Sequence, residues 1–121
     1  MQVLEERAVL ADLDFICSNL TRISILYLLM RSKHTNYCMS LKEISYRLGK
    51  HPRIVIYHLE KLKEYGLVEV VKNSRNGKRR RIWGLNLNRT DLIREVFLYA
   101  TRNFFTQARI ERACSVNRKV R

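Results

Sequence analysis

Apolar residues recur every three or four positions in the first third of the chain, which is the spacing of an amphipathic α-helix. In residues 2–16 they include Leu4, Ala8, Ala11 and Phe15. In residues 20–31 they include Ile23, Leu26, Tyr27 and Met30. Ser18 or Asn19 is the expected N-cap of the second segment. Two helices are therefore predicted before the first polar connection, at residues 34–36.

A pair of short helices is predicted in the middle of the chain. Ser40 and Glu43 form a capping box, in which the hydroxyl and the carboxylate satisfy reciprocal backbone N–H groups where a helix starts. Gly49 ends this helix, and Pro52 suits the first turn of the next, where its missing N–H group costs nothing. Gly66 then ends the second helix. The predicted order is helix, tight turn, helix.

A β-hairpin is predicted directly after this pair. Residues 68–72 and 80–85 are rich in β-forming side chains, and the Asn76-Gly77 pair between them is a strong hairpin-turn signal. Trp83 should anchor the hairpin to the core, and a stacking platform for single strands is the competing interpretation. Helix, turn, helix and hairpin in this order predict a winged helix-turn-helix.

The second helix of the pair has a predicted outer face. With Val55 at the centre of its buried face, Arg53 and Tyr57 point away from the core, Ile54 and Ile56 lie on the flanks, and His58 is expected to be structural. The N-terminal half of a recognition helix enters the major groove of DNA. The expected base-reading residues are Arg53, Ile54, Ile56 and Tyr57. Packing against neighbouring helices is an equally open interpretation of the two isoleucines.

The predicted hairpin carries six cationic residues and no acid within ten positions. Like charges on a two-stranded ribbon repel one another and destabilise it, so a purely structural role does not explain this cluster of cations. Phosphates or a narrow minor groove would suit them. The residues expected to contact backbone or minor groove are Lys50 and His51 in the turn, and Lys72, Arg75, Lys78, Arg79, Arg80 and Arg81 in the hairpin.

A last helix is predicted over residues 91–113, and it carries two apolar stripes. One stripe contains Val96 and its neighbours at helical spacing, and the other contains Leu98 and Phe105. One small domain cannot easily cover both, so we expect the first and last helices to form a homodimer interface. The residues expected in it are Leu4, Ala8, Ala11, Phe15, Ile93, Phe97, Leu98, Ala100, Phe104 and Phe105.

The expected fold is mostly α with a small β-hairpin wing: a winged helix-turn-helix whose N- and C-terminal helices form a dimer interface. The expected divisions are a dimerisation helix at residues 1–17, the winged helix-turn-helix domain at 18–88, a second dimerisation helix at 89–114 and a basic tail at 115–121.

Composition narrows the class of partner. Hydrophobic residues make up 46% of the 121 positions, which is typical of a globular protein, and the formal net charge is +13. A positive field of this size favours a polyanion, nucleic acid first and an anionic membrane surface second. The three cysteines have no metal-ligand spacing, and neither a signal peptide nor a membrane span is expected, which points to the cytoplasm. No catalytic constellation is present, so we expect neither an enzyme nor a cofactor.

Three segments resemble a known family. Residues 19–26 read NLTRISIL, residues 48–59 read LGKHPRIVIYHL, and residues 64–68 read EYGLV. They resemble, in order, the opening helix (D-P-T-R-x-x-I-L), the turn and recognition helix (L-G-x-S-x-x-T-V-S-x-H-L) and the step into the wing (E-x-G-L-V) of winged-helix regulators of the ArsR type, within the broader ArsR/MarR-like group. The resemblance covers somewhat more than half of the chain and implies a transcription regulator.

The chain also departs from that family. Ile54 and Ile56 stand where its reading helix has polar Thr and Ser, so those contacts do not carry over. Metal-sensing members use a cysteine pair in the helix before the turn, or acid and histidine ligands in the last helix. Residues 41–48 contain no cysteine and residues 91–113 contain no histidine, so no metal site is expected.

The sequence thus predicts a homodimeric regulator that binds double-stranded DNA sequence-specifically, with residues 52–65 in the major groove and the wing at 72–83 on backbone or minor groove. A small-molecule or metal effector is not expected. Two alternatives stay open: a winged-helix protein that binds DNA or RNA without sequence preference, and a protein-interaction module of the transcription machinery.

Overall fold

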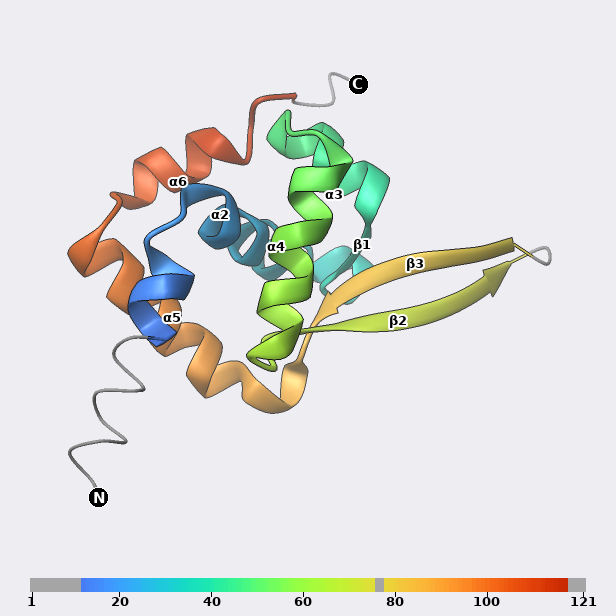
Figure 1. Cartoon of the computed structure of the whole chain (residues 1–121), viewed down its shortest axis with the longest axis horizontal. Helices are drawn as coiled ribbons and strands as arrows, with labels where there is room; N and C mark the ends of the chain where they lie inside the picture. Colours follow the sequence, from blue (N-terminus) through green and yellow to red (C-terminus); the bar gives the residue numbers. More distant parts are fainter. Residues whose placement is uncertain (1–11, 76–77, 118–121) are drawn as a thin grey trace.

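The computed structural model describes residues 12–75 and 78–117, apart from the side chains of residues 72–80 (Figure 1). Residues 12–17 are helical. The following helices and strands are α2 (Leu20–Met30), the 3-10 turn η1 (Lys33–Thr35), β1 (Cys38–Ser40), α3 (Leu41–Leu48), α4 (Pro52–Glu64), β2 (Val68–Arg75), β3 (Lys78–Leu85), the 3-10 turn η2 (Leu87–Arg89), α5 (Thr90–Asn103) and α6 (Gln107–Ala113). Leu4, Ala8 and Ala11 lie outside the described residues.

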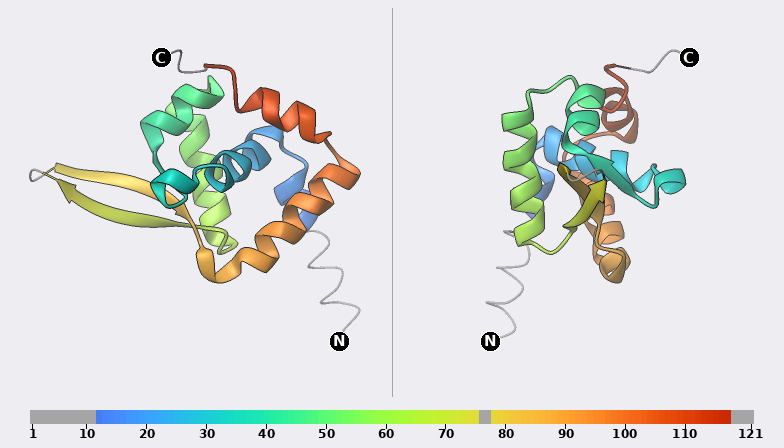
Figure 2. Two further views of the ribbon diagram at one scale, coloured as in Figure 1. Left: turned by 180° about the vertical axis from the view of Figure 1, so that it is seen from behind. Right: turned by 90° about the vertical axis from the view of Figure 1, so that its right-hand side faces the viewer.

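The architecture is a winged helix, as the sequence predicts. Helices α3 and α4 form the helix-turn-helix, and β2 and β3 form a hairpin that projects from the helical body (Figures 1 and 2). The short strand β1 completes a three-stranded antiparallel sheet of order β1-β3-β2. One end of this sheet is packed on the core, and the other extends away from it.

Local hydrogen bonds set the ends of the helix-turn-helix, at the residues that the sequence indicates. The backbone N–H of Glu43 donates to Oγ of Ser40 at 3.1 Å, which caps α3. Gly49 follows α3 with φ of +61°, a left-handed conformation that a residue without Cβ adopts readily. Pro52 stands in the first turn of α4.

Helix α2 lies at the centre of the core. Residues 22–29 are all buried, so this helix has no solvent-facing stripe over that length. All of these residues except Arg22 and Ser24 are hydrophobic, and a helix with apolar residues on nearly every side is expected in the interior of a domain. The other helices and the base of the wing pack around α2, which makes it the support on which the helix-turn-helix rests.

Trp83 anchors the wing to this core. It is paired with Met39 of β1 and Val70 of β2, and its side chain is completely buried. Gly84 follows it because a Cβ at that position would lie 2.7 Å from Sγ of Cys38. With its ring enclosed, Trp83 has no face on which a nucleotide base could stack, so it supports the structure of the wing.

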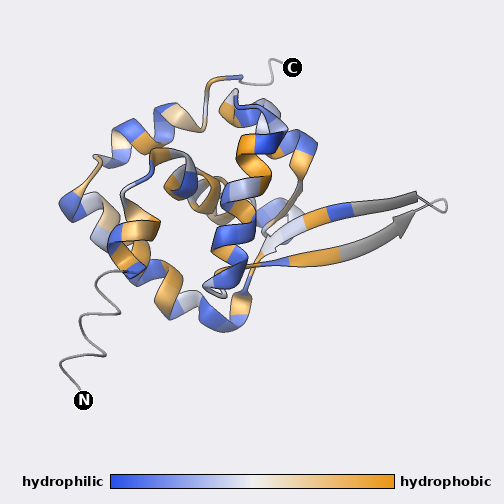
Figure 3. Cartoon of the chain, viewed as in Figure 1, coloured by the Kyte–Doolittle hydropathy of each residue, from blue (hydrophilic) through white to orange (hydrophobic). Residues whose placement is uncertain are grey.

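The prediction of one continuous helix over residues 91–113 is wrong, because the chain turns between α5 and α6. The Thr106 hydroxyl accepts a hydrogen bond from the backbone N–H of Arg109 at 3.2 Å and starts a new helix. Helix α6 then packs against α2: Ile110 is fully buried, and the Tyr27 hydroxyl donates to the Glu111 carboxylate at 3.0 Å. Figure 3 shows hydrophilic and hydrophobic residues alternating along both helices, as amphipathic helices require.

Candidate nucleic-acid interface

The outer face of α4 carries the residues that the helical spacing places there. Arg53 is exposed, Tyr57 is 52% exposed and Ile54 is 47% exposed. The opposite face is closed by Val55, Leu59 and Leu62, all with no exposed surface. Ile56 differs from Ile54, because it is partly buried and packs against the core. The helix therefore offers a cation, an aromatic ring and one aliphatic side chain to a partner.

The turn before α4 places two further residues near this face. Nδ1 of His51 accepts a hydrogen bond from the backbone N–H of Arg53 at 3.1 Å, so His51 is the N-cap of α4. This bond requires an unprotonated Nδ1 and leaves Nε2 as the donor of the ring. Lys50 is exposed beside it. Both residues expected to contact phosphate thus stand at the end of α4 that enters a groove in helix-turn-helix proteins.

An ion pair links the wing to the same side of α4. Nη1 of Arg81 lies 3.8 Å from Oε1 of Glu60, and both side chains are largely exposed. Glu60 is within about 20° of Arg53 around the helix axis. An exposed pair of this length stabilises little, so its significance is geometric. The base of the wing lies beside the outer face of α4, and the two elements can meet one surface together.

The backbone register of the wing brings its cationic positions opposite one another. Lys72 is paired with Arg81, and Arg75 with Lys78. Of the six wing cations, Arg81 is the one whose side chain the structure describes, and it is 68% exposed. Of the other five predicted contacts, Lys72 lies opposite Arg81, and the remaining four lie further along the hairpin toward its turn: Arg75, Lys78, Arg79 and Arg80.

Beneath α4 lies a buried charge that the pattern of apolar residues does not indicate. Arg22 of α2 is only 6% exposed, and among the described residues its Nε and Nη1 atoms have no hydrogen-bond partner. Burial lowers the pKa of Arg22. Burial, and secondarily the charge of Arg22, also lowers the pKa of His58. His58 is buried, in agreement with its expected structural role, and it is held in its neutral form against α2.

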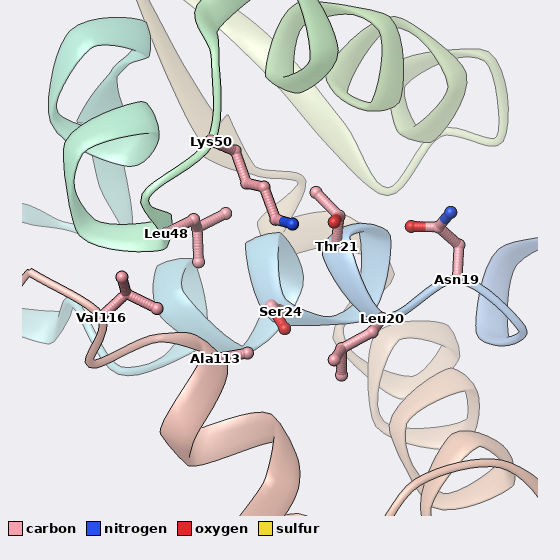
Figure 4. Close-up of a pocket in the computed structure, with 8 residues that line it drawn as sticks. All are labelled: Asn19, Leu20, Thr21, Ser24, Leu48, Lys50, Ala113 and Val116. Atoms are coloured by element: carbon pink, nitrogen blue, oxygen red, sulfur yellow. The ribbon is translucent and has the colours of Figure 1, made fainter.

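The segment after α6 also reaches the helix-turn-helix. The Asn117 side chain donates through Nδ2 to the backbone oxygen of Tyr46 at 2.7 Å, at the end of α3. A cavity of about 330 Å³ lies between this segment, the start of α2 and the turn after α3. In Figure 4, Val116 lines one side of it and Lys50 points toward Thr21 on the other. Sequence reasoning missed this contact, because nothing local to residues 114–117 signals it.

The residues expected at a dimer interface separate into two groups. Ile93 and Ala100 are buried within the chain itself, because α5 uses them to pack on its own core, so they present no surface to a partner in this structure. Phe97 is partly buried and stacks on Tyr27, with ring centroids 5.3 Å apart. The remaining described members keep some exposed surface: Phe15 at 36%, Leu98 at 44% and Phe104 at 39%, with Phe105 partly buried.

Other chemistry has little support in the described part of the chain. Burial raises the pKa of the Cys17 and Cys114 thiols to about 12, so neither is a reactive thiolate at neutral pH. Within residues 12–75 and 78–117, no three His, Cys, Asp or Glu residues come together where they could hold a metal ion. No described helix is both long enough and apolar enough to cross a membrane.

Comparison with known proteins agrees with the geometry. Residues 18–71 match a family model described as a helix-turn-helix domain. The matched segment begins just before α2 and ends within β2, so it includes both helices of the helix-turn-helix. No curated protein and no solved structure matches the chain. Together with the winged-helix fold, the match indicates a DNA-binding regulator of transcription.

Proposed function

We propose that this chain is a sequence-specific regulator of the ArsR type that binds double-stranded DNA as a homodimer. The N-terminal half of α4 enters the major groove, and the wing follows the backbone or the adjacent minor groove. The observation that carries this proposal is the Arg81–Glu60 contact, since it sets the base of the wing beside the outer face of α4. With α4 and the cationic wing on one side of the molecule, both elements can contact the same DNA duplex.

The base sequence of the DNA would be recognised by side chains in the first half of α4. Arg53 can donate two hydrogen bonds to O6 and N7 of a guanine, and the exposed Ile54 can contact a thymine methyl group. Tyr57, one turn further on, can reach a base edge or a phosphate. Ile56 is a weaker candidate because part of its side chain is used in packing.

Affinity would come largely from charge. The formal net charge is +13, and six cations lie within residues 72–81. Each phosphate neutralised by Lys or Arg releases counterions, so binding weakens steeply as salt is added. If six to ten phosphates are engaged, affinity should fall by about 10³ to 10⁵ between about 50 and 200 mM salt.

A second copy would complete the site. Leu98 on α5 and Phe104, the residue directly after this helix, present exposed apolar surface. A two-fold dimer built on this surface would present two recognition helices, and a spacing of about 34 Å between them matches successive major grooves on one face of DNA.

The decisive experiment is to select DNA fragments from a random pool with the purified protein, sequence them, and measure affinity for a selected site across a series of salt concentrations. We expect an enriched, two-fold symmetric sequence and a steep loss of affinity with salt. If the protein binds random duplexes or structured RNA as tightly as the selected site, it is a non-specific nucleic-acid-binding protein and not a sequence-specific regulator. Negligible DNA affinity at physiological salt would instead favour a protein-interaction module.

A further inference from the structure

The cavity between the start of α2, the turn after α3 and the segment after α6 is large enough for a small molecule. Its volume is about 330 Å³, and sites for small ligands measure about 300 to 1,000 Å³. The Cys114 thiol donates to the backbone oxygen of Ser24 at 3.2 Å, which holds the end of α6 on α2. The Asn117 side chain holds the following segment on Tyr46. These two contacts fix the walls of the cavity within the fold.

Positive potential in this cavity comes from two sources. In Figure 4 the ammonium group of Lys50 extends toward Thr21 at the start of α2. In the described part of the chain, Lys50 forms no ion pair with an acidic residue. Helix α2 begins at Leu20, and its first N–H groups have no carbonyl within the helix to bond, so this end carries partial positive charge. None of the residues that line the cavity is acidic, so an anion would be favoured there.

The Ser24 hydroxyl, which also lines the cavity, is buried without a hydrogen-bond partner. Ser24 is 1% exposed, and its Oγ bonds to no group among the described residues. A serine of a helix often donates to the carbonyl four residues back, as Ser32 does to Leu28 at 2.7 Å. Burial raises the pKa of the neighbouring Cys114 thiol to about 12, and the Ser24 side chain lowers it to a smaller extent, but a thiol is a weak acceptor. A buried hydroxyl is costly unless it is bonded, so a ligand in the cavity would gain this donor.

The rest of the lining is mainly apolar. Leu20, Leu48, Ala113 and Val116 contribute aliphatic side chains to it. Val116 is 58% exposed, so a ligand that covers it would remove apolar surface from water. A partner of this cavity therefore needs both a negative charge and a short hydrocarbon chain.

We propose that the cavity binds a small amphipathic carboxylate. The carboxylate would lie between the Lys50 ammonium group, the Ser24 hydroxyl and the start of α2, with its chain against the apolar lining. One ammonium group matches one negative charge, which favours a carboxylate over a phosphate dianion. A cavity of about 150 Å³ holds benzene, so this volume suits a ligand of about eight to twelve non-hydrogen atoms.

The consequence of this binding for DNA rests on the proposed function. Lys50 directly precedes His51, the N-cap of α4, and is expected to contact a DNA phosphate. A carboxylate that holds the ammonium group of Lys50 inside the cavity would remove that contact, so the bound ligand would lower the affinity for DNA. By linkage, DNA would lower the affinity for the ligand by the same factor.

A cavity filled by ordered water is the competing interpretation. Water would satisfy the Ser24 hydroxyl, and it requires neither the charge of Lys50 nor the apolar lining. The two interpretations are separated by ligands that carry only one of the two features, the charge or the chain.

The test is titration calorimetry of the full chain, without DNA, against hexanoate. Hexan-1-ol keeps the chain without the charge, and acetate keeps the charge with almost no chain. Ser24→Ala removes the unpartnered hydroxyl, and Ala113→Leu fills the cavity. Ser45→Ala is the matched control, because Oγ of Ser45 is also buried without a partner among the described residues but lies on α3, outside the lining. Thermal unfolding verifies that each variant is folded, and Ser24→Ala alone suffices if Ala113→Leu is not.

We expect hexanoate to bind the unaltered protein with a dissociation constant of about 1 mM or below, in the range for a ligand of its size. Hexan-1-ol and acetate should bind at least about 10-fold more weakly, because each lacks one part of the interaction. Ser24→Ala should weaken hexanoate binding about 10-fold, the effect of losing a hydrogen bond to a charged group, and Ser45→Ala should leave it unchanged. No binding of hexanoate, equal binding of hexan-1-ol, or equal losses in the two serine variants would each overturn the proposed site.

The effect on DNA is measured separately, with a selected duplex at several salt concentrations. Saturating hexanoate should weaken binding and lower the slope of log K against log salt by about 0.9, which corresponds to one phosphate contact. Acetate at the same concentration controls for ionic strength, and Lys50→Gln should bind the duplex more weakly with no further effect of hexanoate. Hexanoate that binds without changing DNA affinity would overturn the regulatory step alone. A protein that binds hexanoate but no duplex would remove the proposed function and leave the site in place.

Discussion

The guanidinium carbon of Arg22 lies 3.9 Å from the centroid of the Phe15 ring. The two residues come from α2 and from the helical segment at residues 12–17, and their contact lies beneath the recognition helix. A cation over an aromatic face is stabilising. Two of the guanidinium nitrogens nevertheless have no hydrogen-bond partner among the described residues. Phe15, which the sequence suggests as part of a dimer interface, thus serves first as the cover of a buried charge.

Arg22→Met should be neutral or raise the free energy of unfolding by up to about 2 kcal/mol. Each buried donor without a partner costs about 1–3 kcal/mol, and Met keeps the length of the side chain and a favourable sulfur–aromatic contact with Phe15. Urea unfolding followed by circular dichroism measures the difference. Arg22→Lys is the control, which keeps the charge without the planar stacking group and should be less stable than Arg22→Met. A loss above about 2 kcal/mol in Arg22→Met would show that the charge itself is required.

The parts of the fold that local chemistry determines could be predicted from the sequence. The Ser40 cap, the left-handed Gly49 and Pro52 at the start of α4 each depend on residues within a few positions. The exposed and buried faces of α4 follow from helical periodicity around Val55. Trp83 was recognisable as an anchor because it is a large apolar residue on a strand of a two-stranded ribbon.

The parts that depend on distant contacts could not be predicted in this way. No Gly or Pro marks the break near Phe104, and the Thr106 cap is visible only once α6 is seen to fold back on α2. The burial of Arg22 requires that the preceding helix, α2 and α4 come together. The docking of Asn117 on α3 joins residues 71 positions apart, and no local pattern signals such a contact.

His58 should make the protein less stable below neutral pH. Burial first, and then Arg22, lowers its pKa from the ordinary value of 6.5, so the unfolded chain binds the proton more readily than the folded one. The stability that this contributes is present above about pH 6.5 and is lost as pH falls below it, by at most about 1.4 kcal/mol per pH unit. His58→Leu should unfold with a shallower pH dependence between pH 7 and 5. Identical slopes for the two proteins would contradict a neutral His58.

Gly49→Ala should destabilise the protein for two reasons that a second substitution can separate. A left-handed residue with a Cβ costs about 1–2 kcal/mol, and the new Cβ would lie 2.6 Å from Cγ1 of Val116. In the Val116→Ala background the steric part is reduced, so the cost of Gly49→Ala should fall toward the backbone part alone. A double-mutant cycle of unfolding free energies measures the coupling. A coupling of zero would mean that residue 116 does not pack on the turn in solution.

Substitutions in the recognition helix α4 and in the wing should affect DNA binding in different ways. Arg53→Ala should reduce discrimination between a selected site and a variant site by about 1–3 kcal/mol, which is about 5- to 150-fold, because a base-edge contact is lost. Replacing Arg79, Arg80 and Arg81 by Ala should weaken all duplexes about equally and lower the salt slope by up to about 2.7. Competition binding with both duplexes at several salt concentrations distinguishes the two. An unchanged ratio in Arg53→Ala would exclude Arg53 from base reading.

Self-association should depend on two exposed apolar residues, Leu98 on α5 and Phe104 directly after it. Leu98→Glu combined with Phe104→Glu places two charges where a partner copy would bury apolar side chains, and should weaken the dimer at least about 30-fold, the effect expected when central interface contacts are lost. Sedimentation equilibrium over a range of protein concentrations measures the dissociation constant of the dimer. Leu87→Glu is the matched control, because Leu87 is similarly exposed, at 46%, but lies on η2 outside the proposed interface. A dimer that survives the double substitution, or is equally weakened by Leu87→Glu, would place the two-fold contact on another surface.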